Sequence, residues 1–315
     1  MPLDHYVPQV HIKNWCSPDL DGRVHAMRKS DLKRFGPRSQ DICRIEDNSS
    51  NSYLKAERAI EDFLKSIEPK YNISVAKLRE QKIDQEAVFA IAGFVAYILT
   101  CSPASMRIHS APLKNMVEAE AMMLDALGEI GKAPEALGNK SITELIEDGS
   151  VKVQIDPKYP QAMGITSIEH FMSVFGNSPW EILINNEDKS PFFTSDFPVA
   201  IEVVDAARPI NRIVPLSPGL AVRIIPDVSL ARSKHDLSFS KFRSHHRELN
   251  HQEVLGINRL LVQCAENLVI YRDDYGWVDD FVNKYRSFRV ESVTEKIERG
   301  TGYFLPASLR IRRAT

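Results

Sequence analysis

The feature that most constrains the fold is the stretch from Ala87 to Cys101, which reads AVFAIAGFVAYILTC. About fifteen residues of this character need apolar surroundings on every side. The stretch is shorter than the ~20 residues that a membrane-spanning helix requires, and Ser102-Pro103 ends it. It therefore predicts a helix buried in a protein core, with Asp84 as its N-terminal cap and with no membrane as a partner.

Helical patterns lie on both sides of this stretch, over about residues 52 to 175. Before it, apolar residues recur at helical spacing between Tyr53 and Ile67, and Pro69 is expected to end that helix. After it, a helix is expected from about Leu113 to Leu127, where Gly128 stops it.

Two capping boxes predict shorter helices in the same region. Ser141 with Glu144, and Thr166 with Glu169, have the spacing at which a hydroxyl and a carboxylate satisfy the free amides of a first helical turn. We therefore expect one helix to begin after each pair.

The pattern changes after about residue 176, where short β-rich runs alternate with turn residues. These runs are Trp180–Ile184, Pro191–Thr194, Val199–Val203, Arg212–Val214 and Ala221–Ile225. Short runs separated by Asn, Pro and Gly are typical of an antiparallel meander. A helix capped by Asn250 and a strand over Leu268–Arg272 are expected to follow.

This order of elements predicts the α+β class, in which a helical N-terminal half packs with a mainly antiparallel β-sheet from the C-terminal half. No flexible linker marks a boundary near residue 176, so residues 1–315 are expected to form one domain. Its helical part covers about 52–175 and its sheet part about 176–275. The basic tail of about 300–315 is expected to fray at its end.

Charge and cysteine usage narrow the function classes and the compartment. The chain has 40 Lys and Arg against 42 Asp and Glu, a net charge of -2, which excludes a protein whose whole surface attracts nucleic acid. Its 4 cysteines are scattered, as reduced intracellular thiols are. The residues after Met1 lack a basic segment followed by an apolar one, so no secretory signal is expected and the predicted location is cytoplasmic.

Several common cofactor sites have no motif in this chain. There is no Walker A sequence, no G-x-G-x-x-G and no paired Cys-x-x-Cys, so we expect no P-loop ATP site, no NAD and no zinc motif. The histidines between Phe242 and His251 lack the spacing of a zinc-binding helix. With the basic residues beside them they are expected to form a solvated loop, or one that contacts a polyanion.

The most unusual local sequence is at the N-terminus, where His5-Tyr6-Val7-Pro8-Gln9 precedes a short apolar segment. His5 and Gln9 offer a titratable nitrogen and an amide to one site, if this segment is held in place. The alternative is that His5 is a hydrogen-bonded anchor for the terminus.

Two carboxylates follow in the segment Ala56 to Glu61. Glu57 and Glu61 are four residues apart, so in a helix they would project from one face. Such a pair can hold Mg²⁺ or Mn²⁺, or divide acid and base roles. The alternative is a solvated helix face.

Two further segments offer charged groups at defined places. Arg107 follows Pro103, which breaks the apolar helix, so the guanidinium can bind an anion or cap helix carbonyls. Ser195 and Asp196 follow the apolar run Phe192-Phe193 and precede Pro198. Strand ends often present catalytic or binding groups, but an Asp at this place can equally cap a turn.

These motifs, in this order, resemble the pattern of a mostly bacterial family called the domain of unknown function 4238. The resemblance rests on His5–Gln9 with its following apolar residues, on Phe192–Pro198, and on Val214–Pro218. It also includes the segment that ends in Arg107 and the helix from Asn258 to Ala265, and it extends over about residues 5 to 275. The resemblance implies that His5, Gln9, Arg107 and Asp196 converge on one site. Ser195 and Asn258 are added as candidate substrate- or anion-binding residues.

The residue types favour chemistry at phosphorus. His5 would act as general acid or base, Asp196 or the pair of glutamates would hold a metal or orient water, and Arg107 would offset developing charge. This predicts a metal-assisted phosphodiester or nucleotide hydrolase, similar to a nuclease, as an effector in a bacterial toxin or phage-defence system.

Two other functions stay open. One is a non-catalytic sensor that binds a nucleotide or another anion. The other is an interaction protein, in which the same residues are polar staples of the core. The expected partners are nucleic acid or a nucleotide, and a protein partner is also considered.

Overall fold

The computed structural model describes residues 3–205, 209–227, 229–230, 234–299 and 302–314. Its α-helices are α1 (Gln9–Ile12), α2 (Ala59–Arg79), α3 (Gln85–Cys101), α4 (Pro103–Ala126), α5 (Ile142–Glu147), α6 (Lys158–Thr166), α7 (Ile168–Asn177), α8 (His251–Cys264) and α9 (Val278–Tyr285). Its strands are β1 (Leu3–His5), β2 (His25–Arg28), β3 (Arg34–Phe35), β4 (Arg44–Glu46), β5 (Pro179–Ile184), β6 (Thr194–Ser195), β7 (Ala200–Glu202), β8 (Asn211–Ser217), β9 (Leu220–Ile224), β10 (Arg243–Glu248), β11 (Leu268–Tyr271), β12 (Phe288–Thr294), β13 (Ile297–Arg299), β14 (Gly302–Phe304) and β15 (Ala307–Arg313). Helices dominate the first half and antiparallel strands the second, which confirms the α+β class.

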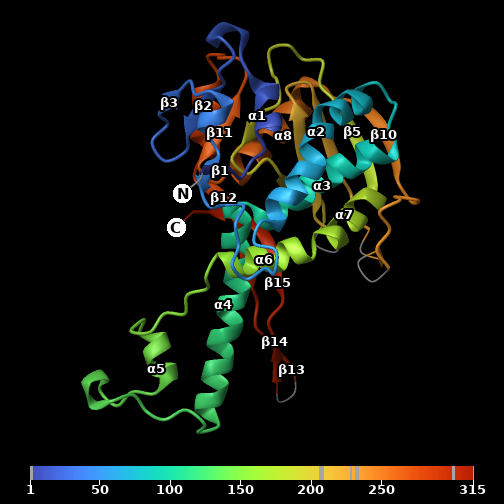
Figure 1. Ribbon diagram of the computed structural model, residues 1–315. Helices are drawn as coiled ribbons and strands as arrows, with labels where there is room; N and C mark the ends of the chain where they lie inside the picture. The colour runs from blue at the N-terminus through green and yellow to red at the C-terminus, as the bar shows by residue number, and fades with distance from the viewer. Residues whose placement is uncertain (1–2, 206–208, 228, 231–233, 300–301, 315) are drawn as a thin grey trace.

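The core is built around α3, as its apolar sequence predicts. The carboxylate of Asp84 accepts a hydrogen bond from the Ala87 amide at 2.9 Å and caps the helix. Almost every residue from Ala87 to Ile98 is buried, and α2, α6 and α7 pack around the helix (Figure 1). Within the described ranges no single helix is long and apolar enough to cross a membrane, and α3 and α4 pass such a test only when taken together across their 54° bend.

Helix α2 corrects two predictions. It begins at Ala59, later than the pattern from Tyr53 predicts, and it continues through Pro69 to Arg79. A proline inside a helix removes one backbone hydrogen bond, but the buried stripe of α2 continues on both sides of it, with Ile67 before and Tyr71 after. Packing of that stripe against α3 therefore outweighs the local break.

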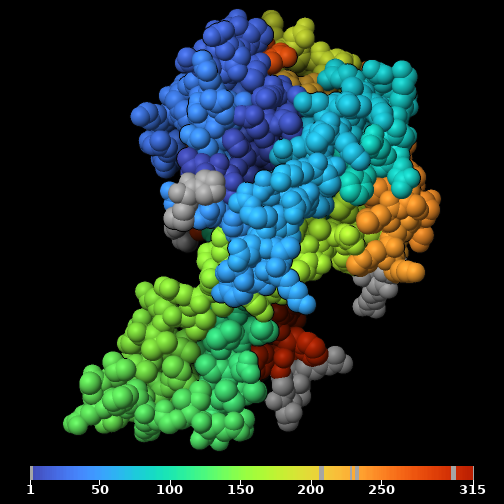
Figure 2. Space-filling model, in the orientation of Figure 1, coloured from blue at the N-terminus to red at the C-terminus, as the bar shows by residue number. Residues whose placement is uncertain are grey.

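Helix α3 ends at the predicted Ser102-Pro103 break, and α4 begins there, where the Ser102 hydroxyl accepts a hydrogen bond from the Ser105 amide at 3.2 Å. It is longer than expected, because the segment before Leu113 is helical too. Its second half leaves the main body and carries α5, beside the β13–β14 hairpin (Figure 1). Figure 2 shows this projection below the main body.

One capping box is confirmed and the other is wrong. Ser141 and Glu144 exchange hydrogen bonds at the start of α5. Thr166 is instead the last residue of α6, an unpredicted helix, and its hydroxyl donates back to the Ala162 carbonyl at 3.0 Å. A hydroxyl used in this way inside a preceding helix is not available to cap the next one.

Two main sheets share the second half of the chain. The five-stranded sheet has the order β10-β5-β9-β8-β7, in which β5, β9, β8 and β7 form the predicted antiparallel pairs. The four-stranded sheet has the order β3-β2-β11-β6, so β11 joins the N-terminal strands and not the meander. Of the run Pro191–Thr194, only Thr194 lies in a strand.

Two expected loops are strands. The histidine-rich segment forms β10, which pairs in parallel with β5, and the C-terminal tail forms β15, which pairs with β12 along its whole length. Backbone pairing with a neighbouring strand orders both segments, and polar side chains give no signal of that neighbour. The single domain predicted for residues 1–315 stays a prediction.

Candidate functional site

The N-terminal motif is anchored by His11, a residue that the sequence analysis passed over. His11 lies in α1 and has no exposed surface. Its Nδ1 is 2.7 Å from the Tyr71 hydroxyl, its Nε2 is 2.8 Å from the Thr194 hydroxyl, and its ring stacks on Phe94. Burial lowers its pKa to about 3, so the ring is neutral near pH 7. The only sequence signal was its place between two apolar residues, Val10 and Ile12.

Two neighbours of His11 extend this anchor. The Trp15 indole donates a hydrogen bond to the Phe192 carbonyl at 2.8 Å, and the Asn14 amide donates to the Leu216 carbonyl at 2.9 Å. The two family motifs of the sheet, Phe192–Pro198 and Val214–Pro218, are therefore both held by the N-terminal motif. The motifs meet as the resemblance implies, but through other side chains than expected.

His5 and Gln9 do not take part in these contacts with the sheet within the described residues. His5 ends β1, and burial lowers its pKa, while the backbone groups of Ser39 and Gln40 raise it. Its Nε2 is buried and makes no hydrogen bond within the described part of the chain. Gln9 is the first residue of α1. Among the described residues no hydrogen bond joins either side chain to Asp196 or Arg107.

Asp196 is buried, with 3% of its surface exposed, and caps the turn before β11. Its two carboxylate oxygens accept hydrogen bonds from the Glu266 amide at 2.9 Å and the Asn267 amide at 2.8 Å. Burial raises the pKa of Asp196 to about 6, against the lowering effect of backbone hydrogen bonds from Asn267 and Leu268. The geometry favours the turn-capping interpretation, although the capped turn is 70 residues away in the chain.

Arg107 reaches the same turn from α4. Its guanidinium forms a bidentate pair with Glu266, at 2.8 Å for both nitrogen–oxygen distances, and a third bond of 2.8 Å to Glu291. It also donates to the Val290 carbonyl at 2.7 Å. Asp196 and Arg107 therefore both contact Glu266, through its backbone amide and its carboxylate, and the single site predicted for His5, Gln9, Arg107 and Asp196 stays a prediction.

Ser195 and Asn258 also serve the backbone. The Ser195 hydroxyl accepts from the Phe197 amide at 3.1 Å. The Asn258 side chain accepts from the Phe193 amide and donates to the Pro191 carbonyl, each at 2.9 Å. Both residues are buried and hold the segment from Pro191 to Phe197 in its irregular path.

The structure overturns the basis for a metal site at Glu57 and Glu61. Glu57 lies in the turn before α2, so the two carboxylates do not share a helix face. Glu61 forms ion pairs with Lys65, at 3.1 Å, and with Arg58, and these partners lower its pKa. Across the described ranges no cluster of three or more His, Cys, Asp or Glu residues has the arrangement of a metal site.

We expect Glu57→Gln and Glu61→Gln to be tolerated. Glu57 is exposed, and the ion pairs of Glu61 are at the surface and screened by water, so the melting temperature should move by no more than about 2 °C in either variant. Thermal melts with and without Mg²⁺ or Mn²⁺ check this. A metal-dependent rise in melting temperature that is present in the wild type and absent from both variants would contradict it.

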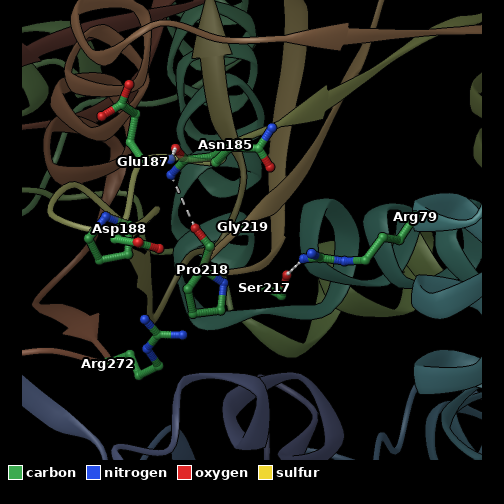
Figure 3. A pocket seen from close by; sticks show the side chains of 10 residues that line it. Arg79, Asn185, Glu187, Asp188, Ser217, Pro218, Gly219 and Arg272 are labelled. Carbon is green, nitrogen blue, oxygen red and sulfur yellow. Dashed lines mark hydrogen bonds between the residues drawn. The ribbon is translucent and has the colours of Figure 1, made fainter.

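A polar pocket of about 390 Å³ lies where several elements end together (Figure 3). Arg79 is the last residue of α2, Asn185 follows β5, Ser217 ends β8, and Arg272 follows β11. The other lining residues come from the turns between these elements: Asn186, Glu187, Asp188, Pro191, Pro218 and Gly219. The family motif Val214–Pro218 thus ends in this pocket, and the anchor at Asn14 and Trp15 supports its walls.

Arg79 points into the pocket from α2 (Figure 3). Its guanidinium donates to the Ser217 hydroxyl at 3.2 Å, and no carboxylate lies within ion-pair distance among the residues that the structure describes. A Cβ atom at Gly219 would lie 3.1 Å from Nη2 of Arg79 and 3.1 Å from the Asn185 carbonyl oxygen. A side chain at this position would therefore be in tight contact with both groups, and glycine leaves room for the arginine beside the backbone.

The other charged residues that line the pocket are Arg272, Glu187 and Asp188. Arg272 is paired with Asp273, with an Nε–Oδ2 distance of 2.8 Å. Glu187 and Asp188 bring two exposed carboxylates, and the loop that carries them is tied by the Asn185 side chain, which accepts from the Glu187 amide at 2.9 Å. The pocket therefore offers both a free guanidinium and acceptor oxygens.

Sequence reasoning missed Arg79 and Arg272. Arg79 stands in the charged segment Lys77–Lys82, which is typical of a helix end, and Arg272 precedes two aspartates that look like solvated turn residues. The available signal was the Ser217-Pro218-Gly219 turn, because a glycine after a strand often allows a close approach to the backbone.

Comparison with known proteins gives one match. A family model described as "Protein of unknown function (DUF4238)" matches residues 4–275, a range that includes the pocket and the whole anchor around His11. No curated protein and no solved structure matches the chain.

Proposed function

This chain belongs to the DUF4238 family, and we propose that it binds a ribonucleotide in the polar pocket between Arg79 and Arg272. The observation that carries the proposal is the position of Arg79. Its guanidinium faces the pocket and, within the described residues, has a hydroxyl but no carboxylate as a partner.

A phosphate group suits Arg79. The planar fork of a guanidinium matches two phosphate oxygens, and the Ser217 hydroxyl beside it is a further donor. The absence of a side chain at Gly219 leaves the wall flat where the arginine lies. Arg272, held by Asp273, adds a second positive charge to the same pocket.

The carboxylates of the pocket favour a ligand that also donates hydrogen bonds. Glu187 and Asp188 would repel a simple anion such as inorganic phosphate, but they can accept hydrogen bonds from sugar hydroxyls, as acidic residues do in nucleotide sites. A volume of about 390 Å³ lies in the range of small-ligand pockets. A nucleotide whose phosphate binds Arg79 and whose ribose binds Glu187 and Asp188 would therefore have a partner for each of these charged side chains.

Metal-assisted hydrolysis stays a prediction, and we propose that it would take place at this pocket and not at the residues first expected. Glu187 and Asp188 are residue types that bind Mg²⁺ or Mn²⁺ together with substrate phosphates. A nuclease-like reaction would therefore use this acidic loop in place of Glu57 and Glu61. The toxin or phage-defence role stays a prediction in the same way.

The binding experiment compares the wild type with Arg79→Gln. Isothermal titration with ribonucleoside mono-, di- and triphosphates should give saturable binding to the wild type, weakened at least about tenfold in Arg79→Gln, because a charged hydrogen bond to phosphate is lost. The matched control is Arg259→Gln, an exposed arginine on α8 outside the pocket, which should bind as the wild type does.

Three outcomes decide between the functions. Equal binding by wild type and Arg79→Gln, or no binding of any nucleotide, contradicts the proposal. Incubation with RNA, DNA and nucleotides in Mg²⁺, Mn²⁺ or chelator tests turnover. Product that forms only with metal, and not in Arg79→Gln, would make the protein a hydrolase at the same pocket.

A further inference from the structure

A second arginine, Arg212, is half-buried on the helix-facing side of the five-stranded sheet and has no carboxylate partner among the residues that the structure describes. Arg212 is the second residue of β8, and its neighbours across the sheet are Ile201 on β7 and Ile224 on β9. Directly opposed residues on neighbouring strands point to the same face. Arg212 is therefore a charged residue between two buried isoleucines.

The hydrogen bonds of Arg212 are incomplete. One terminal nitrogen, Nη1, donates to the Ile210 carbonyl at 2.6 Å and to the Asn211 carbonyl at 3.4 Å, while Nε is buried and has no partner in the described part of the chain. No described carboxylate lies within 4 Å of the guanidinium, and the residues outside the described ranges include no Asp or Glu.

Arg107 and Arg212 differ in their carboxylate partners. Arg107 has two carboxylate partners, Glu266 and Glu291. For Arg212 the neighbouring titratable group is the buried thiol of Cys264, and burial lowers the pKa of Arg212 to about 10. A buried charge without a counter-ion is costly, and a bound anion is one way to supply it.

Arg212 forms part of the wall of a mainly apolar cavity of about 80 Å³. The wall brings together α3, α4, α7, β7, β12 and β15, and consists mainly of aliphatic and phenylalanine side chains, including Ile108 and Phe175. A second apolar cavity of about 260 Å³, between α4, α6 and α7, shares His109 and Phe171 with the first. The His109 ring donates to the Leu99 carbonyl at 3.0 Å, so it is held by α3 and does not pair with Arg212.

We propose that the cavity at Arg212 binds the carboxylate of a small aliphatic or aromatic carboxylic acid, whose apolar part lies against Phe171 and Phe175. Two carboxylate oxygens match the fork of one guanidinium. A phosphate would bring more oxygens than this apolar wall can satisfy, and each unsatisfied oxygen would be penalised. The site is separate from the nucleotide pocket and does not depend on it.

The size of the cavities limits the acid. A cavity of 150 Å³ holds benzene in another protein, so about 80 Å³ accommodates the carboxylate and only the first few carbons. A longer acid must extend past His109 and Phe171 into the cavity of about 260 Å³. Affinity is therefore expected to rise from acetate to hexanoate.

The test uses thermal melts and isothermal titration of the full chain with acetate, butanoate, hexanoate and benzoate. Hexanoate should raise the melting temperature saturably, while hexanamide, which has the same shape without the charge, should not. Arg212→Met should fold at least as well as the wild type, because a half-buried charge with an unpaired Nε is removed, and should bind hexanoate at least about tenfold more weakly. Arg259→Gln serves again as the control.

Two results would overturn the proposal: no response of the wild type to any acid, or the same response in Arg212→Met. If Arg212→Met fails to fold, crystals of the wild type grown with hexanoate decide the question. A carboxylate bonded to the Arg212 guanidinium is then expected, and an empty cavity contradicts the site.

Discussion

Acidification from pH 6.5 to about 3 is expected to remove about 5 kcal/mol of the free energy of unfolding through His11 alone. Burial lowers the pKa of His11 from 6.5 to about 3, and its two ring nitrogens are held by the hydroxyls of Tyr71 and Thr194. Between these two pH values the His11 ring binds a proton in the unfolded chain but stays neutral in the folded protein. Stability is therefore complete above pH 6.5 and is lost as the pH falls towards 3.

The size of this effect follows from linkage. At about 1.4 kcal/mol for each pH unit between the two pKa values, the loss is about 5 kcal/mol, which equals the whole stability of many domains. Urea unfolding at pH 7, 6, 5 and 4 measures it. In His11→Gln, whose amide can replace both hydrogen bonds, the same change of pH should have a much smaller effect.

Parallel pH profiles of the wild type and His11→Gln would show that His11 does not carry the acid sensitivity. A second measurement needs no variant. The ring resonances of His11 in the native protein should not titrate between pH 7 and pH 4, because burial keeps the ring neutral in that range.

Asp196→Ala is expected to lower the free energy of unfolding by about 3–5 kcal/mol. The change leaves the buried amides of Glu266 and Asn267 without an acceptor, opens a small cavity, and removes a negative charge near the buried ammonium of Lys29. Asp196→Asn should cost less, because its carbonyl oxygen still accepts one of the two amides.

The carboxyl of Asp196 also has a pH signature, opposite in sign to that of His11. Its pKa is raised from 3.8 to about 6, so the folded protein binds a proton that the unfolded chain releases in this window. The wild type should therefore lose stability relative to Asp196→Asn as the pH rises from about 4 to about 6. Urea unfolding of both proteins across that range checks the sign.

The Asp196 variants also separate a structural role from a catalytic one. If Asp196 only holds the turn before β11 through its hydrogen bonds, Asp196→Ala should be less stable than the wild type. Nucleotide binding by the fraction that remains folded should then be unchanged. A variant that melts like the wild type but has lost a measured turnover would instead place Asp196 among the catalytic residues.

The motifs at the N-terminus of this chain drew attention to His5 and Gln9, but neighbouring side chains in the same segment make the contacts with the sheet. His5 and Gln9 were singled out for their unusual letters, yet His11, Asn14 and Trp15 make the bonds to the sheet. A motif records that a segment matters. It does not separate side chains that face a pocket from those that hold the backbone behind it.

Elements whose signals are local were predicted well. α3 follows from its apolar letters and the Asp84 cap, and α8 from the capping box of Asn250 and Glu253, which the structure contains. Elements that depend on a neighbour were missed. Pro69 does not end α2 because both halves of that helix pack on α3, and β10 is a strand because the edge of β5 accepts it.

The sequence by itself determined the class of fold, the central helix, the meander and the segments that meet, since periodicity, capping and turn chemistry act over a few neighbouring residues. The tertiary structure decided the partner of each polar group. His11 meets Thr194 across 183 positions of the chain and Arg107 meets Glu266 across 159. Some carboxylates and guanidinium groups form such contacts, while others line a cavity, as Arg79 and Arg212 do. Packing between distant segments decides which of these occurs, and no local sequence pattern encodes that packing.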